Sequence, residues 1–154
     1  MSKKYRPNVA AVILSCNYPN ECELLIAERN DVKGAWQFPQ GGIDNDEDVR
    51  TALFRELEEE IGTNAVEIIA EHPGWISYDF PAAIANKRYP YDGQRQKYFL
   101  VRLKNNAAIN LETKSPEFVQ HKFVAPEKVL KEVSFFKRPI YKQVLAHFKK
   151  SGYL

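Results

Sequence analysis

The segment from residue 41 to residue 63 constrains this chain most, because it joins a predicted helix to a cluster of carboxylates. Glu56, Glu59 and Glu60 are spaced i, i+3 and i+4, so a helix places their side chains on one face with Cβ atoms about 5 to 6 Å apart. Carboxylates at this spacing repel one another, and the helix dipole disfavours anions near the C-terminal end. A positive partner must relieve this repulsion, which indicates a divalent-metal site.

The same helix has a second, apolar face that can cover a sheet. Asn45 or Asp46 is the predicted N-cap, Glu47 and Asp48 suit the first turn, and Gly62 is the predicted stop. The core face and the carboxylate face are therefore different faces of one helix. Apolar residues recur at helical spacing at Val49, Ala52, Leu53, Leu57 and Ile61.

The length and composition of the chain favour one globular domain covering residues 1–154. The formal net charge is only +2, which argues against a protein that binds nucleic acid over its whole surface. No stretch approaches the roughly 20 apolar residues that a membrane helix needs, and the apolar run 9–16 is too short for a signal sequence. We therefore expect a cytoplasmic protein with no membrane partner, in which Cys16 and Cys22 are reduced.

Hydrophobic patterning predicts an α/β fold in which helices cover a mixed β-sheet. A segment rich in Pro, Tyr and basic residues, 80–96, is predicted to form a long loop beside the site or a mobile excursion. Pro126 and Pro139 can each occupy the first position of a helix, which predicts helices over 126–133 and 139–149. The predicted strands are 9–14, 23–27, 66–70, 74–79, 97–104 and 118–124.

Residues 41–63 also resemble a known signature, that of the Nudix family, G-x(5)-E-x(7)-R-E-U-x-E-E-x-G-U with U aliphatic. Only the last position departs from it, because Thr63 replaces an aliphatic residue. The resemblance implies a single-domain α/β/α sandwich and the hydrolysis of a nucleoside diphosphate linked to another moiety, with water attacking phosphorus. The matching positions are Gly41, Glu47, Arg55, Glu56, Leu57, Glu59, Glu60 and Gly62.

The resemblance implies Mg²⁺ or Mn²⁺ as cofactor, with two or more ions when substrate is bound. Mg²⁺ prefers a few carboxylates with substrate phosphates and waters, and bound ions can lower the pKa of a water toward neutrality. Glu56 or Glu117 is expected to be the general base, with Glu60 also in the catalytic set. Arg55 is expected to orient Glu47 or the other glutamates rather than contact substrate. The implied metal ligands are the backbone carbonyl near Gly41 and the carboxylates of Glu56, Glu59, Glu60 and Glu117.

Sequence blocks outside the signature are similar to a subgroup of that family, the bacterial RNA pyrophosphohydrolases, which are also described as dinucleoside polyphosphate hydrolases. The similar blocks are 6–9, 36–42, 93–99, 116–118 and 136–138 with Tyr141, and they extend over essentially the whole chain. The similarity implies conversion of a 5′-triphosphate or 5′-diphosphate RNA end to a monophosphate, which initiates mRNA decay.

The subgroup pattern also implies a set of substrate-binding positions. Phe136 beside Lys137 can form a stacking platform next to a phosphate contact, and we expect Phe136 to be exposed and Phe135 to lie in the core. The family's base pocket varies at 134–136, so the preferred second nucleotide of the RNA is left open. The implied substrate-binding residues are Arg6, Arg29, Tyr78, Gln96, Phe136 and Lys137.

Three functions remain open on this sequence. The first is an RNA 5′ pyrophosphohydrolase, and the second is an enzyme of the same chemistry that acts mainly on dinucleoside polyphosphates. The third is a non-catalytic module that binds nucleotides or RNA ends. The intact set of Glu56, Glu59 and Glu60 argues against the third, because a binding module has no use for clustered carboxylates beside an anionic ligand. No stable protein partner is indicated.

Overall fold

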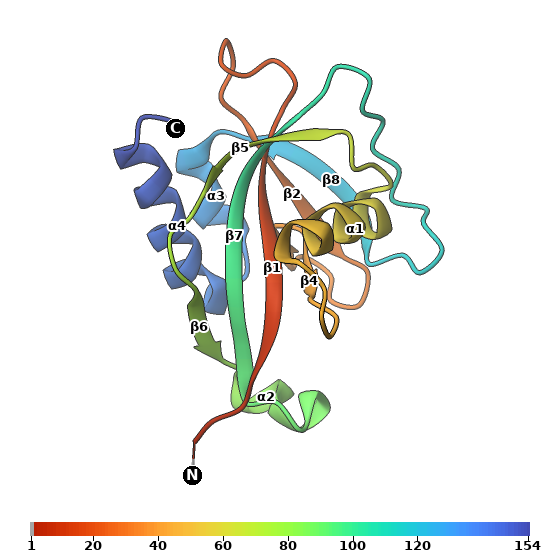
Figure 1. Cartoon of the computed structure of the whole chain (residues 1–154), viewed down its shortest axis with the longest axis vertical. Helices are drawn as coiled ribbons and strands as arrows, with labels where there is room; N and C mark the ends of the chain where they lie inside the picture. Colours follow the sequence, from red (N-terminus) through yellow and green to blue (C-terminus); the bar gives the residue numbers. More distant parts are fainter. Residues whose placement is uncertain (1) are drawn as a thin grey trace.

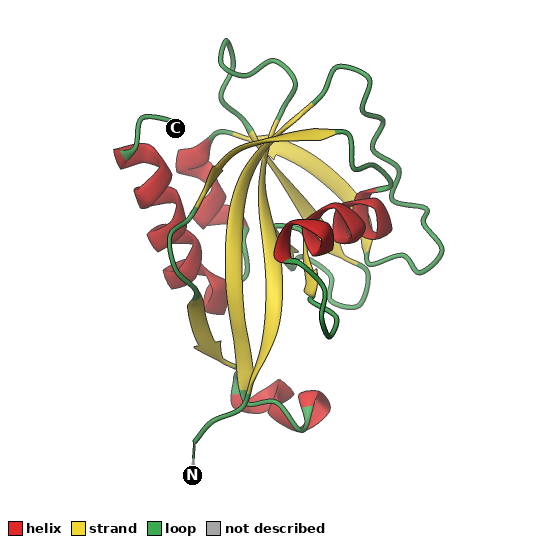
Figure 2. Ribbon diagram, in the orientation of Figure 1, coloured by secondary structure: helices red, strands yellow, loops and turns green. Residues whose placement is uncertain are grey.

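A mixed β-sheet of eight strands lies between two helical layers in the computed structural model, which describes residues 2–154. The main strand order is β3-β2-β1-β7-β5, while β4 pairs with β1, β6 with β7 and β8 with β2. Helix α1 lies over one face of the sheet, and α3 and α4 lie over the other (Figures 1 and 2). The strands are β1 (Tyr5–Leu14), β2 (Leu24–Arg29), β3 (Trp36–Gln37), β4 (Gln40–Gly42), β5 (Val66–Glu71), β6 (Ile76–Asp79), β7 (Gly93–Leu103) and β8 (Phe118–Val124).

The long strands β1 and β7 form the parallel centre of the sheet, paired from Tyr5 opposite Gly93 to Leu14 opposite Arg102. Every other strand pair is antiparallel among the residues that the structure describes. The end of β1, from Asn8 to Leu14, is buried without interruption because helices cover both faces of the sheet. The helical segments are α1 (Val49–Ile61), α2 (Ala82–Ala85), η1 (Asn86–Arg88), α3 (Pro126–Glu132), η2 (Phe135–Lys137) and α4 (Arg138–Lys150), of which η1 and η2 are 3₁₀ turns.

Two apolar layers hold the sheet between the helices. Leu53 and Leu57 of α1 pack with Phe99 and Val101 on one face. The other face carries the larger core, whose fully buried side chains include Phe38, Tyr98, Tyr141, Val144 and Phe148. This arrangement confirms the predicted α/β/α sandwich with a mixed sheet.

The start of helix α1 differs from the prediction. Asp48 is the N-cap, and its Oδ2 accepts hydrogen bonds from the backbone N–H groups of Arg50 (3.1 Å) and Thr51 (3.3 Å). Asn45 and Asp46 precede the helix, and Asp46 lies in a turn with a φ of 63°. The later start leaves Glu47 outside the helix. The predicted stop is confirmed, since Gly62 caps the helix with a φ of 74°.

The predicted loop 80–96 was partly wrong. It contains the short helix α2 and the turn η1, and strand β7 begins at Gly93, four residues before the predicted strand. The early start follows from parallel pairing with β1, which a reading of local pattern does not reveal. Figure 1 shows α2 beside the ends of β1 and β7. Cys16 and Cys22 are free thiols, and no helix among residues 2–154 has the length and apolar character needed to cross a membrane.

Candidate metal and nucleotide site

The two glycines of β4 bring the carboxylate face of α1 against the sheet. Strand β4 pairs with β1 through Gly41 opposite Val9 and Gly42 opposite Asn8. A Cβ atom on Gly41 would overlap the carboxylate of Glu56, and one on Gly42 would overlap the guanidinium of Arg6. A larger residue at either position would therefore displace the end of the Glu56 or Arg6 side chain, because both side chains lie directly against this backbone.

Arg55 is the centre of the carboxylate cluster. It binds Glu47 in a bidentate manner, from Nε to Oε2 (2.7 Å) and from Nη2 to Oε1 (2.8 Å). Its Nη1 donates to Glu56 (2.9 Å) and Glu59 (3.2 Å), and Nη2 also donates to the carbonyl of Gly42 (2.9 Å). The Arg55 guanidinium lowers the pKa of Glu47 to about 2. Arg55 thus orients the carboxylates, in the geometry expected for a positioning residue.

Glu60 is the most buried carboxylate of the cluster, with 5% of the residue exposed. Burial raises its pKa well above the usual range, and the neighbouring Glu56 and Glu117 raise it further. No Lys or Arg within the described part of the chain forms an ion pair with Glu60. A buried carboxylate beside two others, without a cation, is unfavourable and fits the hard oxygen donors that Mg²⁺ takes.

The donor set fits a divalent cation, but its side chains are not gathered around one point. Across residues 2–154, no three Asp, Glu, His or Cys side chains already form a metal-binding group. One reason why the carboxylates do not converge is that Arg55 donates hydrogen bonds to an oxygen of Glu56 and to an oxygen of Glu59. Arg55 binds only one oxygen of each of these carboxylates, which leaves the other oxygen for a cation.

Glu117 faces the α1 glutamates from the segment that leads into β8. Its carbonyl accepts a hydrogen bond from Asn30 N–H (2.9 Å), and Asn30 Nδ2 donates to the carbonyl of Pro116 (2.6 Å). These bonds hold the segment against the end of β2. A cleft of ≈ 250 Å³ lies beside this segment, and both carboxylates and guanidinium groups line it. Its lining includes Arg6, Arg29, Gly41, Glu56, Glu59, Glu60, Arg88 and Glu117. A polyphosphate would lie between metal ions and guanidinium groups in this cleft.

Arg29 lies in the cleft with an acidic neighbour that the sequence did not single out. It donates from Nε (2.8 Å) and Nη2 (2.6 Å) to the two carboxylate oxygens of Asp31. This pairing raises the pKa of Arg29 and lowers that of Asp31. Asp31 therefore fixes the guanidinium and reduces its net charge toward substrate.

Tyr78, Phe136 and Lys137 meet at the edge of the cleft, as the predicted substrate site requires. The rings of Tyr78 and Phe136 have centroids 6.3 Å apart, and Lys137 Nζ lies 5.0 Å from the Tyr78 centroid. Lys137 donates to Gln40 Oε1 (2.6 Å) and is 2% exposed. Burial and the nearby Arg29 lower its pKa to about 7.

The expected burial of Phe135 and of Phe136 was wrong. Phe135 is 82% exposed rather than in the core, and its ring lies 5.6 Å from the Arg138 guanidinium. Phe136 is half-buried against Tyr78 rather than fully exposed. Both follow from the 3₁₀ turn η2, in which successive side chains point in different directions, so that only one of two adjacent aromatic rings can face the sheet.

Gln96, predicted to bind substrate, is fully buried in the structure. Its Nε2 donates to Asn8 Oδ1 (2.8 Å) and Gln40 Oε1 (2.9 Å), and its Oε1 accepts from the Tyr98 hydroxyl (2.8 Å). Gln96 therefore supports Gln40 in this structure, and its binding to substrate stays a prediction. Gln40 and Gln94 were not among the predicted substrate-binding residues, although they lie in the similar blocks 36–42 and 93–99. Gln94 accepts hydrogen bonds from Tyr78 (2.6 Å) and Gln40 (3.1 Å).

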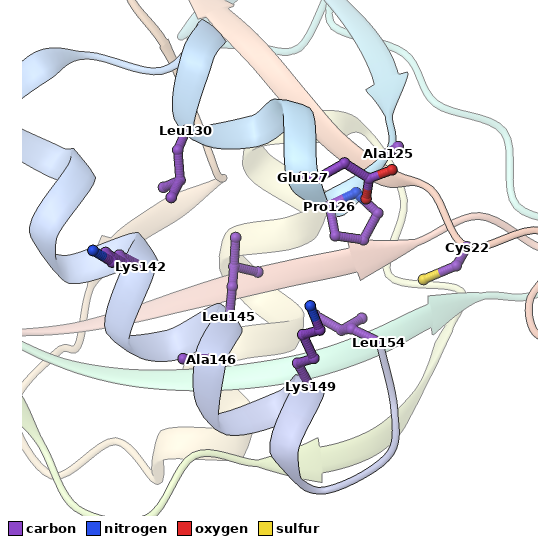
Figure 3. Close-up of a pocket in the computed structure, with 10 residues that line it drawn as sticks. All are labelled: Cys22, Ala125, Pro126, Glu127, Leu130, Lys142, Leu145, Ala146, Lys149 and Leu154. Carbon is purple, nitrogen blue, oxygen red and sulfur yellow. The ribbon is translucent and has the colours of Figure 1, made fainter.

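A hollow larger than this cleft lies elsewhere in the molecule (Figure 3). It has a volume of ≈ 470 Å³ between α3, α4 and the C-terminus, with apolar walls that include Leu130, Leu145 and Leu154. None of its lining residues belongs to the carboxylate cleft. The concentration of titratable groups, rather than volume, therefore identifies the candidate site.

Comparisons with known proteins agree with this geometry. Residues 4–144 match the family model described as NUDIX domain. The chain is 62% identical to an RNA pyrophosphohydrolase of Nitratiruptor sp., over 98% of this chain and 97% of that protein. It is 57% identical to an RNA pyrophosphohydrolase of Helicobacter pylori, over 100% and 99%. In fold it is similar to the E. coli dihydroneopterin triphosphate pyrophosphohydrolase, with a TM-score of 0.72 at 17% identity, covering 94% of this chain and 99% of that one.

The family match, the similarity to these relatives over nearly their whole length and the loop-helix-loop with its carboxylates all agree. The chain belongs to the Nudix family.

Proposed function

We propose that this protein removes phosphate from the 5′-triphosphate or 5′-diphosphate end of RNA and leaves a 5′-monophosphate. The observation that carries the proposal is the cleft itself, where glutamates of α1 face Arg6, Arg29 and Arg88, with Tyr78 and Phe136 at the edge. The high identity to proteins named RNA pyrophosphohydrolase supports RNA as the substrate. This activity would act at the start of mRNA decay and place the protein in the cytoplasm.

The carboxylates and the arginines have separate tasks in this proposal. Gly41 through its carbonyl, with Glu56, Glu59, Glu60 and Glu117, would hold Mg²⁺ or Mn²⁺, two or more ions when substrate is present. Bound ions supply charge neutralisation on the phosphates and a lower pKa for a bound water. Arg6, Arg29 and Arg88 also line the cleft and can donate to phosphate oxygens. Arg55 keeps the carboxylates aimed at the cleft.

The chemical step needs one proton transfer. A water oxygen attacks a phosphorus atom of the anhydride, the bridging P–O bond breaks, and the leaving phosphate or pyrophosphate takes the electron pair. The water proton passes to Glu117 or Glu56, both of which line the cleft. Arg55 holds one oxygen of Glu56, whereas Glu117 forms no ion pair among the described residues, so Glu117 is the freer acceptor.

The base site, formed by Tyr78, Phe136 and Lys137, would make the enzyme selective for a nucleotide. Tyr78 and Phe136 offer ring faces for stacking, and Lys137 lies between them and Gln40. Stacking on aromatic faces beside cations tolerates different bases and is common in the binding of single-stranded RNA. Few protein groups neutralise the charge of the Lys137 ammonium group. This group can donate a hydrogen bond to a nucleotide that takes the place of the Gln40 side chain.

A direct competition tests the substrate. Triphosphorylated RNA and diadenosine tetraphosphate, at equal concentration with Mg²⁺, are compared by kcat/KM. We expect higher kcat/KM for RNA, with 5′-monophosphate RNA as product. Much faster hydrolysis of diadenosine tetraphosphate would assign the protein to dinucleoside polyphosphates, and no hydrolysis of either substrate would leave a binding module. Repeating the reaction in H₂¹⁸O identifies the phosphorus atom that is attacked.

A further inference from the structure

A second hollow adjoins the carboxylate cleft, and the turn η1 contributes Lys87 and Arg88 to its lining. Its volume is ≈ 230 Å³. Arg6, Arg88 and Gln94 line both this hollow and the cleft, so the two are direct neighbours. The remaining walls come from an aromatic and basic segment and consist of Phe80, Lys87, Tyr89 and Tyr91.

A series of aromatic rings connects the base site to this hollow. Phe136 and Tyr78 have centroids 6.3 Å apart, and Tyr78 and Phe80 have centroids 6.1 Å apart at an interplanar angle of 86°. Beyond Phe80 the hollow is bordered by Tyr89 and Tyr91. The rings thus lead from the predicted position of a nucleobase to a second place where a base can stack.

The charge of the hollow suits a polyanion. Arg6, Lys87 and Arg88 are cationic, and none of its lining residues is acidic. Lys87 and Arg88 are exposed and form no ion pair within the described chain. Tyr89 is 86% exposed, so the face of its ring is accessible to a nucleobase.

We propose that this hollow is a subsite for the third nucleotide of the RNA, with its base on Tyr89 and its phosphate near Lys87. The proposal rests on the proposed function, in which the terminal phosphates lie in the carboxylate cleft and the second nucleotide meets Tyr78 and Phe136. Aromatic faces combined with cations are the usual means of holding a single strand without reading its sequence. The subsite distinguishes an RNA strand from a compound with only two nucleosides.

The test compares triphosphorylated RNAs of two and five nucleotides, by kcat/KM, in the wild type and in Tyr89→Ala. We expect the wild type to prefer the longer RNA by about tenfold, in the range that stacking of one base gives. Tyr89→Ala should lose that preference and hydrolyse the dinucleotide within a factor of two of the wild type. Tyr89→Phe keeps the ring and should keep the preference.

Lys87→Ala tests the phosphate contact, with Lys128→Ala on α3 as an exposed control. Lys87→Ala should lower kcat/KM for the longer RNA about threefold and weaken its dependence on salt, whereas Lys128→Ala should change neither. Equal losses on both RNAs, unchanged preference in Tyr89→Ala, or a larger loss on diadenosine tetraphosphate would overturn the subsite. Failure of the wild type to hydrolyse either RNA would instead refute the proposed function.

Discussion

Replacing Lys137 by Met should stabilise the metal-free protein, because this lysine is buried at a cost. Lys137 is 2% exposed, and burial lowers its pKa from 10.5 to about 7. The difference between these pKa values corresponds to about 5 kcal/mol of unfavourable free energy for the charged form. Met has a similar length without the charge. Loss of the hydrogen bond to Gln40 costs about 1 kcal/mol, since Gln96 still donates to the same oxygen.

The net gain in the free energy of unfolding is therefore about 3 kcal/mol or more at pH 7 and below. Between pH 7 and the unfolded pKa near 10.5, the unfolded chain binds more protons at this site, so wild-type stability rises with pH. The advantage of Lys137→Met should decline accordingly, by about 2 kcal/mol from pH 7 to pH 9. Its RNA turnover should nevertheless fall, because the lysine lies at the base site.

Urea unfolding with a chelator present, at pH 6, 7, 8 and 9, measures this effect. Lys142→Met on α4 is the matched control, since Lys142 is exposed and its replacement should change stability by less than about 0.5 kcal/mol. The reasoning is refuted if Lys137→Met is no more stable than the wild type at pH 7, or if its advantage does not change between pH 7 and pH 9.

Three further changes test the cleft. Glu60→Gln should abolish turnover while the circular dichroism spectrum stays native and the metal-free melting temperature stays equal or rises, because a buried carboxylate beside Glu56 and Glu117 is removed; a loss of folding would mean that the carboxylate is structural. Glu117→Gln should lower kcat at saturating Mg²⁺ by about 10²- to 10⁴-fold if Glu117 is the general base, and a rate within twofold of wild type excludes that role. Gly41→Ala should reduce kcat more than stability, since its Cβ displaces the Glu56 carboxylate; urea unfolding and steady-state kinetics separate the two effects.

Local spacing along the chain was sufficient to predict the centre of the site. The i, i+3, i+4 pattern of Glu56, Glu59 and Glu60 depends only on helix geometry, and the stop at Gly62 depends only on its left-handed conformation. The prolines that begin α3 and α4 also act locally, and these helices lie within one residue of their predicted bounds.

Two of the errors arose at positions whose structure depends on contacts between residues distant in the sequence. Gln96 faces inward because β7 pairs with β1, which places it opposite Asn8. Burial of Phe136 rather than Phe135 depends on the position of Tyr78. The N-cap error is the exception, because the hydrogen bonds that fix the cap lie within three residues of it.

We propose that the α1 glutamates bind the divalent metal on which hydrolysis of the 5′-terminal RNA phosphate depends. The most direct test of this dependence follows turnover of triphosphorylated RNA as Mg²⁺ is titrated into chelator-treated protein, with the 5′ end of the product identified. We predict no turnover without metal, recovery on addition of Mg²⁺ in the wild type but not in Glu60→Gln, and a 5′-monophosphate product. Metal-independent turnover, or an RNA end that remains triphosphorylated at saturating Mg²⁺, would contradict the claim.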